Sequence, residues 1–504
     1  MHELIRLTAR EAVDLLWRRE LSPLDLVEAS ARRIAEVDPI VNAMPILCLD
    51  RAREHARRLM QQRASGGERP RGWLGGLPIA IKDLMDVAGV RTTYGSELFK
   101  DNVAQRSHPL VERIEALGAI VIGKSNTPEF GVGGNTVNTL FGSTRNPWNT
   151  RLTAGGSTGG GAAALAAGEI WLAQGTDHGG SLRRPASYCS VVGMRCSPGR
   201  ITRGSARTLW TAQVVQGPMA RNVEDLALFL DAMAGFCPHD PLTFEAPAVG
   251  FSDAVRAARA PKRIAYTGDF GGKVAVDHET RDICARMVRQ FETLGCVVDE
   301  ASPDVTDADE VFLVLRGQNF LVERESLLDT HREQLKPDLV WNIERGRQQN
   351  VARLAWAERE RSKLYQRVVA LLQTHELLIT PAATTPAWDV GQRHPPLIDG
   401  VKPPNIMAAS LLNSIITLTG LPSLVVPCGF DQFGRPIGLQ ITGRPRGEAA
   451  VLQAGALFEQ MTGLARRLPI DPAAGVPAPG DPVPGTPPPE HGAAPSAPGP
   501  ASSS

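Results

Sequence analysis

The chain lacks the features typical of nucleic-acid-binding and membrane proteins. Basic and acidic residues are equal in number, at 54 each, so no net charge attracts a polyanion or an anionic membrane. Aromatic residues are only 5% of the chain, which leaves few platforms for base stacking. No run approaches the roughly 18 consecutive apolar residues of a membrane span. These absences favour soluble small-molecule chemistry, with no nucleic-acid and no membrane partner.

The sequence also shows no CxxC pair and no pattern typical of a signal peptide. The seven cysteines are scattered and include no CxxC pair, which is typical of reduced thiols in the cytoplasm. The charged start, MHELIRLTAREAVDLLWRRE, has neither the apolar core nor the cleavage site of a signal peptide. No Cys/His spacing resembles a zinc site. We therefore expect a cytoplasmic protein without a metal.

What is present is an alternation of short apolar runs and helical patterns. A capping box at Thr8 and Glu11 and a Ser22-Pro23 start predict two amphipathic helices near the beginning. Strands that are apolar throughout and separated by helices predict an α/β fold, a single large domain whose mixed sheet is covered by helices on both faces. The other predicted elements are a loop at 61–76, strands at 78–81, 119–123, 263–266, 296–299, 377–380, 423–428 and 436–442, and helices at 279–294 and 351–374.

The segment 471–504 differs in composition from the rest. It reads DPAAGVPAPGDPVPGTPPPEHGAAPSAPGPASSS, with many prolines and almost no large apolar side chain. Such a segment cannot bury enough surface to fold. We expect a disordered tail that is a solvated end rather than a Pro-rich docking peptide.

Two glycine clusters each carry a serine. GGSTGGG (155–161) contains Ser157, and GTDHGGSLRRP (175–185) contains Ser181 close to His178. Glycine clusters expose backbone N–H groups, but the first one lacks the lysine of a phosphate-binding P-loop. The second departs from the GxSxG pattern of hydrolases, because Leu182 and Arg183 follow the serine. The clusters alone leave a flexible loop and a serine nucleophile both open.

Seven blocks, taken in order, resemble the amidase signature family of serine hydrolases, and the resemblance covers about residues 5–468. It implies the amidase signature fold, with a helical segment at 1–60 packed on a catalytic domain at 61–468. It also implies hydrolysis of a linear or cyclic carboxylic amide C–N bond, a small-molecule amide substrate, no cofactor, and a homodimer. The blocks are GGLPIAIKDLMDVAGVRTTYGS (75–96), SNTPEFG (125–131), LFGSTRNPWN (140–149), GGSTGGGAAALAAG (155–168), GTDHGGSLRRPA (175–186), VVGMRCSPGR (191–200) and GLPSLVVPCGFDQFGRPIGLQITGRPRGEAAVLQAG (420–455).

The resemblance assigns a Ser–cis-Ser–Lys triad. Ser181 is the nucleophile, Ser157 the bridging serine and Lys82 the base, with a cis peptide joining Gly156 to Ser157. Lysine suits this role because burial can lower its pKa, whereas arginine stays protonated. Only eight of the 54 basic residues are lysine, and Lys82 directly follows the apolar PIAI. Lys124 is the rival base, but its Gly-Lys-Ser-Asn setting predicts the solvated end of a strand.

Residues around Ser181 take supporting roles in the family. Asp177 and Arg183 are expected to form a charge-assisted pair that braces the turn. Thr158 keeps the hydroxyl of a serine that is common there, and Arg184 is expected to be solvated. The His178 imidazole would face elsewhere and would not act as the base. Backbone N–H groups would hold the oxyanion, here those of His178, Gly179, Gly180 and Ser181.

The family lines its acyl pocket with residues after the SNTPEFG block and with the divergent region 303–420. In this chain the first group is Gly131, Val132, Gly133, Gly134 and Asn135, whose glycines leave room for a bulky or aryl acyl group.

Two alternatives share the triad or the fold. One is the glutaminase-like A subunit of a tRNA-dependent amidotransferase, which needs partner subunits. The other is a catalytically inactive scaffold on the amidase fold. We favour an independent amidase, because no glutamine-pocket residue can be placed in the sequence and all three triad residues are present.

Overall fold

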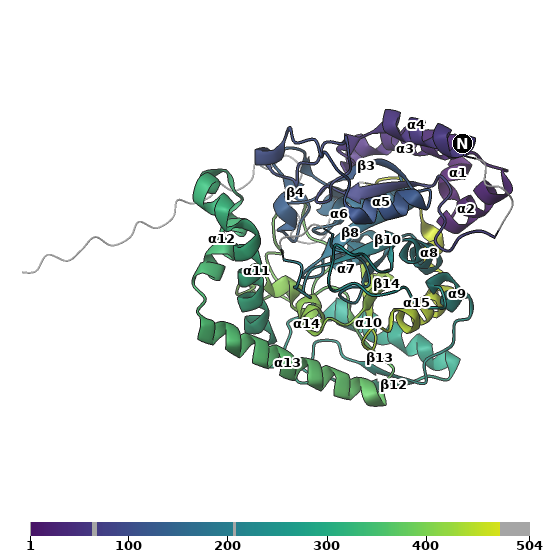
Figure 1. Ribbon diagram of the computed structural model, residues 1–504. Coiled ribbons are helices and arrows are strands. Elements are labelled where there is room, and N and C mark those ends of the chain that lie inside the picture. The colour runs from purple at the N-terminus through teal and green to yellow at the C-terminus, as the bar shows by residue number, and fades with distance from the viewer. Residues whose placement is uncertain (1, 63–67, 205–207, 474–504) are drawn as a thin grey trace, which may run out of the picture.

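The computed structural model describes residues 2–62, 68–204 and 208–473, and it confirms the α/β prediction (Figure 1). Within these ranges, eleven strands form one sheet, in the spatial order β1 (Ile46–Leu47), β3 (Ile120–Ser125), β2 (Pro78–Lys82), β8 (Leu172–Asp177), β10 (Val215–Ala220), β9 (Val192–Arg195), β14 (Ser423–Phe430), β15 (Pro436–Thr442), β13 (Leu377–Pro381), β11 (Arg263–Tyr266) and β12 (Val297–Glu300). The sheet is mixed: β2 is parallel to β3 and β8, and β11 is parallel to β12 and β13, whereas other neighbours are antiparallel. Two short hairpins, β4 (Val137–Asn138) with β5 (Gly142–Ser143) and β6 (Arg145–Asn146) with β7 (Asn149–Thr153), lie outside it.

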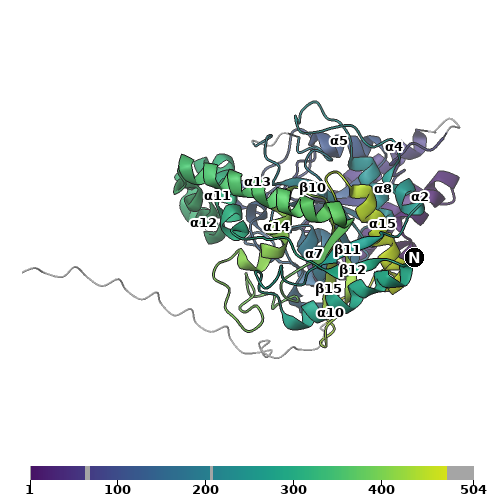
Figure 2. The ribbon, with the colours of Figure 1, turned by 90° about the horizontal axis from the view of Figure 1, so that it is seen from below.

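Helices cover both faces of the sheet. They are α1 (His2–Arg6), α2 (Ala9–Arg18), α3 (Pro23–Val41), α4 (Leu49–Gln61), α5 (Pro109–Ala116), α6 (Gly159–Ala167), α7 (Arg183–Cys189), α8 (Val223–Met233), α9 (Phe251–Arg256), α10 (His278–Val288), α11 (Ala308–His331), α12 (Pro337–Arg347), α13 (Val351–Thr374), α14 (Leu411–Thr419) and α15 (Glu448–Thr462). One apolar core packs α2, α5, α8, α10 and α15 on one face, and a second packs α3, α4, α6 and α7 on the other. Helices α11 and α12 lie at the end of the molecule away from α1 and α2 (Figures 1 and 2).

The first four residues of strand β2 are apolar because the strand is buried on both faces of the sheet. Side chains of a strand alternate between the two faces, and both faces here are covered. Ile79 and Ile81 belong to one core, while Ala80 belongs to the other. The same alternation places Lys82 on the Ala80 face, toward the start of α6, so the position of this amine follows from the strand's periodicity.

The sequence predicted where elements lie better than where they end. The segments 263–266, 436–442 and 351–374 match β11, β15 and α13 in full. The predicted helix 279–294 starts one residue earlier, and its α-helical part ends at Val288, before a 3₁₀ segment at Arg289–Leu294. Strands β1, β8, β9 and β10 were not predicted. β8 (LAQGTD) and β10 (VQGPMA) carry polar residues, glycine and proline, and are strands because of their neighbours in the sheet.

The predicted capping box at Thr8 and the predicted helix start at Ser22-Pro23 are both confirmed. Thr8 accepts a hydrogen bond from Glu11 N at the start of α2, and Ser22 accepts one from Asp25 N at the start of α3. The predicted tail falls outside the described residues from 474 onward. In the part of the chain that is described, no helix combines the length and apolar character needed to cross a bilayer.

Candidate active site

The three residues of the predicted triad lie at the ends of neighbouring elements. Lys82 is the last residue of β2, Ser157 precedes α6, and Ser181 lies in the turn between β8 and α7. Because β2 and β8 are adjacent and parallel, their carboxyl ends reach the same edge of the sheet. Ser157 and Ser181 line one cavity of about 430 Å³ at this edge.

Lys82 is completely buried, and its amine meets three hydroxyl groups. Nζ lies 2.7 Å from Ser157 Oγ, 2.9 Å from Thr158 Oγ1 and 3.0 Å from Thr176 Oγ1. Burial lowers the pKa of Lys82 well below its usual range, although the charge of Asp177 opposes the shift. The amine is thus suited to be neutral and to accept a proton from a hydroxyl. Thr176 was missed, because a threonine within a strand carries no sequence signal of this contact.

One backbone hydrogen bond joins the two glycine-rich segments. The Gly156-Ser157 peptide is cis, as the resemblance implied. Thr158 N donates to Ser181 O at 3.1 Å. Ser181 is only 9% exposed, yet it lines the cavity, so a substrate must enter the cavity to reach it.

Asp177 anchors the turn that carries Ser181. Its carboxylate accepts hydrogen bonds from Arg183 NH2 at 2.8 Å, Arg195 NH1 at 3.1 Å, Gly180 N at 3.2 Å and Leu182 N at 3.0 Å. Burial alone would raise the pKa of Asp177, but the two guanidinium groups outweigh burial and hold it below its usual range. The expected Asp177–Arg183 pair is confirmed, with Arg195 as a second partner that the sequence did not indicate.

Among the expected oxyanion donors, the Gly180 N–H already has a hydrogen-bond partner. Its N–H is used by Asp177, so we remove it from that set. Gly180 has φ +99°, and a Cβ there would lie 2.5 Å from Asn413 Oδ1, which explains the need for glycine. His178, Gly179 and Ser181 all line the cavity, and none of their N–H groups donates to another described residue. These three amides stay in the set of expected oxyanion donors.

His178 is held away from Ser181 by two neighbours. Its Nε2 pairs with Gln213 Oε1 at 2.9 Å, and its Nδ1 lies 3.3 Å from Arg316 NH1. Since Arg316 can only donate, Nδ1 must be the acceptor, and the ring is the neutral tautomer protonated at Nε2. Burial, followed by the charge of Arg316, lowers the pKa of His178 well below its usual range.

Two predictions of solvent exposure were wrong. Lys124 is completely buried in β3, where Nζ lies 3.1 Å from Asp83 Oδ1 and 2.8 Å from Thr92 Oγ1. The strand continues past the predicted end, which buries this lysine as an ion pair. Arg184 is also buried, and it donates to Ser410 Oγ at 2.6 Å and to Gly156 O at 3.2 Å. It packs over the cis peptide because α7 turns inward directly after Ser181.

Four of the five predicted acyl-pocket residues line the cavity. Gly131, Val132, Gly133 and Gly134 form part of its wall, and a Cβ on Gly131 would lie 3.4 Å from Ser157 Oγ. Asn135 does not line it. The Asn135 amide instead donates to the carbonyls of Val390 and Gln392, at 2.8 and 3.0 Å, because its side chain points into the protein toward that loop.

The opposite wall comes from the divergent region 303–420. It combines aromatic and apolar groups with charged ones, among them Arg316, Asn319, Phe320, Asp338, His394 and Met407. These positions were expected only as a range, because no pattern in that region distinguishes a pocket residue from a helix-packing residue.

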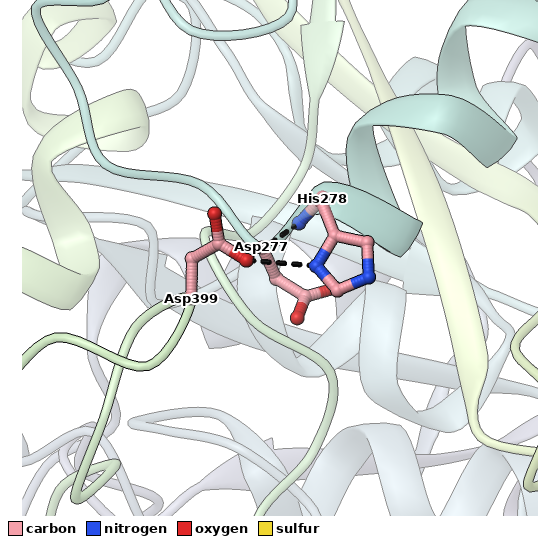
Figure 3. Close-up of side chains that lie close together, drawn as sticks. All are labelled: Asp277, His278 and Asp399. Atoms are coloured by element: carbon pink, nitrogen blue, oxygen red, sulfur yellow. Dashed lines mark hydrogen bonds and ion pairs between the residues drawn. The ribbon is translucent and has the colours of Figure 1, made fainter.

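One further cluster has the composition of a metal site. Among the described residues, only Asp277, His278 and Asp399 bring three potential ligand atoms together (Figure 3). His278 Nδ1 pairs with Asp399 Oδ1 at 2.8 Å, and Asp277 Oδ1 caps α10 by accepting from Thr280 N at 3.0 Å. A helix cap and an exposed pair explain these contacts, so we assign no ion to them.

Comparison with known sequences places the chain among amide-processing enzymes. A family profile described as Amidase matches residues 25–452. The A subunit of the glutamyl-tRNA(Gln) amidotransferase of Moorella thermoacetica is 34% identical over 93% of this chain and 99% of its own length. The acylamidase of Rhodococcus erythropolis is 32% identical over 92% of this chain and 97% of its own.

Solved structures show the same architecture. A bacterial aryl acylamidase of the amidase signature family superposes with a TM-score of 0.85 at 27% identity, covering 94% of this chain and 99% of its own. A 6-aminohexanoate cyclic dimer hydrolase superposes with a TM-score of 0.80 at 25% identity, covering 92% and 99%.

Proposed function

This chain belongs to the amidase signature family and is a hydrolase of amide C–N bonds, and we propose that it acts through an acyl-enzyme on Ser181. The observation that carries the proposal is the buried Lys82 amine, 2.7 Å from a serine hydroxyl that shares the cavity with Ser181. The seven free cysteines are consistent with the cytoplasmic setting, which we retain as a proposal.

The proposed reaction moves one proton along the triad. Ser181 attacks the amide carbonyl and passes its proton to Ser157, while Ser157 passes its own to neutral Lys82. The N–H groups of His178, Gly179 and Ser181 hold the negative oxygen of the tetrahedral intermediate. Lys82 then returns the proton through Ser157 to the leaving nitrogen, and water releases the acyl group by the same steps.

A second candidate is the glutaminase half of a tRNA-dependent amidotransferase. The similarity to the Moorella thermoacetica subunit favours it, since that match covers 99% of the subunit. The two functions differ in what the isolated chain does. An independent amidase releases ammonia from simple amides on its own, whereas the subunit would release it from glutamine only after partner subunits are added.

The relay predicts that Ser157→Ala lowers kcat by roughly 10²–10³-fold, within the range of general acid–base catalysis. The melting temperature should change little, because the residue removed is a small hydroxyl beside a cavity. Stopped assays of ammonia release and thermal unfolding measure the two quantities. Ser252→Ala is a matched control, since its hydroxyl is also buried, has no partner and lies in α9. Near-normal turnover in Ser157→Ala would exclude the relay.

His178→Ala should lower kcat/KM by less than about 10-fold, below the contribution of a general base. Both ring nitrogens are already engaged by Gln213 and Arg316, and Ser181 is not among their hydrogen-bond partners in the described structure. Initial rates on a neutral aliphatic amide are sufficient as a test. A loss of about 10⁴-fold, the upper end of what a general base contributes, would instead identify His178 as the base.

A further inference from the structure

Two arginines in the cavity wall carry charge that the protein does not neutralise. Arg316, from α11, and Arg184, from α7, line the cavity and are almost completely buried. Within the described structure, neither guanidinium forms an ion pair with a carboxylate. A buried charge normally has such a partner, because removing an ion from water costs several kcal/mol.

The contacts of Arg316 are all with neutral groups. Nε donates to Asn342 Oδ1 at 2.7 Å, NH1 donates to His178 Nδ1 at 3.3 Å, and the guanidinium lies 4.7 Å from the centre of the Phe320 ring. Its NH2 group donates to no described residue. Burial, followed by the charge of Arg184, lowers the pKa of Arg316 to about 9. This guanidinium therefore retains unused donors and has no described carboxylate within ion-pair distance.

Arg184 has the same deficit. NH1 and NH2 donate to Ser410 Oγ and to Gly156 O, which are neutral, and Nε is buried without a partner. Other buried arginines differ from these two. Arg183 and Arg195 share Asp177, with Arg183 NH2 at 2.8 Å from its carboxylate.

Arg221, directly after β10, also lacks a carboxylate partner among the described residues, but it donates to two backbone carbonyls and does not line the cavity. Arg316 and Arg184 thus combine a missing counter-charge with a position in the cavity wall.

Asp338 is the acidic group that partly offsets Arg316. Its carboxylate also lines the cavity, and it raises the pKa of Arg316. However, Asp338 Oδ2 lies 3.3 Å from His394 Nε2 and 3.7 Å from Lys336 Nζ. Because this carboxylate already faces Lys336, it cannot balance Arg316 and Arg184 as well.

We propose that the substrate is an amide that carries a carboxylate, bound by Arg316 and Arg184 while the amide carbonyl reaches Ser181. A guanidinium presents parallel N–H donors that match the two oxygens of a carboxylate. The cavity of about 430 Å³ is the size of a small-molecule site. Phe130 and Phe320, which belong to one apolar cluster and both line the cavity, would contact the carbon chain between the two ends. This inference rests on the proposed function and narrows its substrate class.

Matched pairs of amides test the carboxylate directly. Succinamate, glutaramate and adipamate are compared with butanamide, pentanamide and hexanamide, which have the same carbon number without the charge. We expect the best anionic amide to exceed its neutral partner in kcat/KM by at least about 10-fold, the value of one good charge-assisted contact. Arg316→Gln should reduce this ratio toward one, and Arg316→Lys should keep part of it. Arg263→Gln, which removes an exposed pair with Asp299 on β11, should leave the ratio unchanged.

A binding measurement on the wild-type chain separates the anion site from the chemistry. Glutarate should raise the melting temperature and compete with neutral amides, whereas 1-pentanol, which has the same number of carbons but no carboxylate, should do neither at the same concentration. If glutarate binds but no amide is hydrolysed, the anion site stands and the proposed function falls. If neutral amides are hydrolysed as well as anionic ones and glutarate does not bind, the anion site is overturned and the amidase remains. If no amide reacts and glutarate does not bind, both proposals fail.

Discussion

Lys82→Met is expected to lower kcat/KM by about 10⁴-fold, the upper end of what a general base contributes. Methionine fills a similar volume but cannot accept the Ser157 proton, so Ser181 loses the group that activates it. In the wild type, kcat/KM should fall at low pH as Lys82 becomes protonated. That decline should have an apparent pKa well below 10.5, because burial lowers the pKa of this amine. Ammonia release measured across pH tests both statements.

The same substitution should not destabilise the fold at neutral pH. The sign follows from linkage: the unfolded chain binds a proton at Lys82 below pH 10.5, while the folded chain resists it. The Lys82 amine therefore lowers the free energy of unfolding at neutral pH, and this cost shrinks as pH rises toward 10.5. Lys82→Met removes the cost. We expect the unfolding free energy of Lys82→Met to exceed that of wild type by the largest amount near pH 7, and this difference to shrink toward pH 10.

Lys124→Met is the matched control for this stability effect. Both lysines are completely buried and lie at the carboxyl ends of adjacent parallel strands, but Lys124 forms an ion pair with Asp83. Removing one partner leaves a buried carboxylate unpaired, which typically costs about 3–5 kcal/mol. Lys124→Met should therefore lower the denaturant midpoint of unfolding, whereas Lys82→Met should not. A large loss of stability in Lys82→Met would show that its amine is charged in the folded protein.

The contrast between these lysines also shows what the sequence could predict. Lys82 was found from its apolar strand, the rarity of lysine in this chain, and the family pattern around it. Lys124 follows an equally apolar strand and was assigned to solvent, because its counter-charge, Asp83, lies 41 positions away in the chain. Local composition reports that a side chain is near a core. It does not report which partner tertiary structure provides.

The two walls of the cavity also differ in how far the sequence predicts them. Its serine wall follows from glycine-rich segments whose order and content are distinctive, and the α/β layers follow from apolar strands. Its other wall comes from α11, α12 and the loop after β13, and Arg316 lies in α11 within a run of consecutive buried residues, 311–317. Arg184 was assigned to solvent for a related reason, because charge alone does not show that α7 turns inward. The groups proposed to select the substrate were therefore the ones least visible in the sequence.

Asp177→Asn is expected to lower the unfolding free energy by about 3–5 kcal/mol, because it leaves two buried guanidinium groups without their counter-charge. Arg183 and Arg195 both contact this carboxylate, and both are completely buried. Activity should fall as well, since the N–H groups of Gly180 and Leu182 lose the charged acceptor that fixes the turn before Ser181. Urea unfolding and kcat measured on the folded fraction separate the two effects.

The pH dependence distinguishes loss of charge from loss of shape. The folded pKa of Asp177 lies below its ordinary value of 3.8, so its carboxylate contributes its full stability above that value and loses it as pH falls further. The difference between wild type and Asp177→Asn should therefore be constant from about pH 5 to 8 and shrink below about pH 4. Asp253→Asn removes an exposed ion pair with Arg256 and should change stability by less than about 0.5 kcal/mol. A constant difference across the whole pH range would mean that packing, and not the counter-charge, holds the nucleophile turn in place.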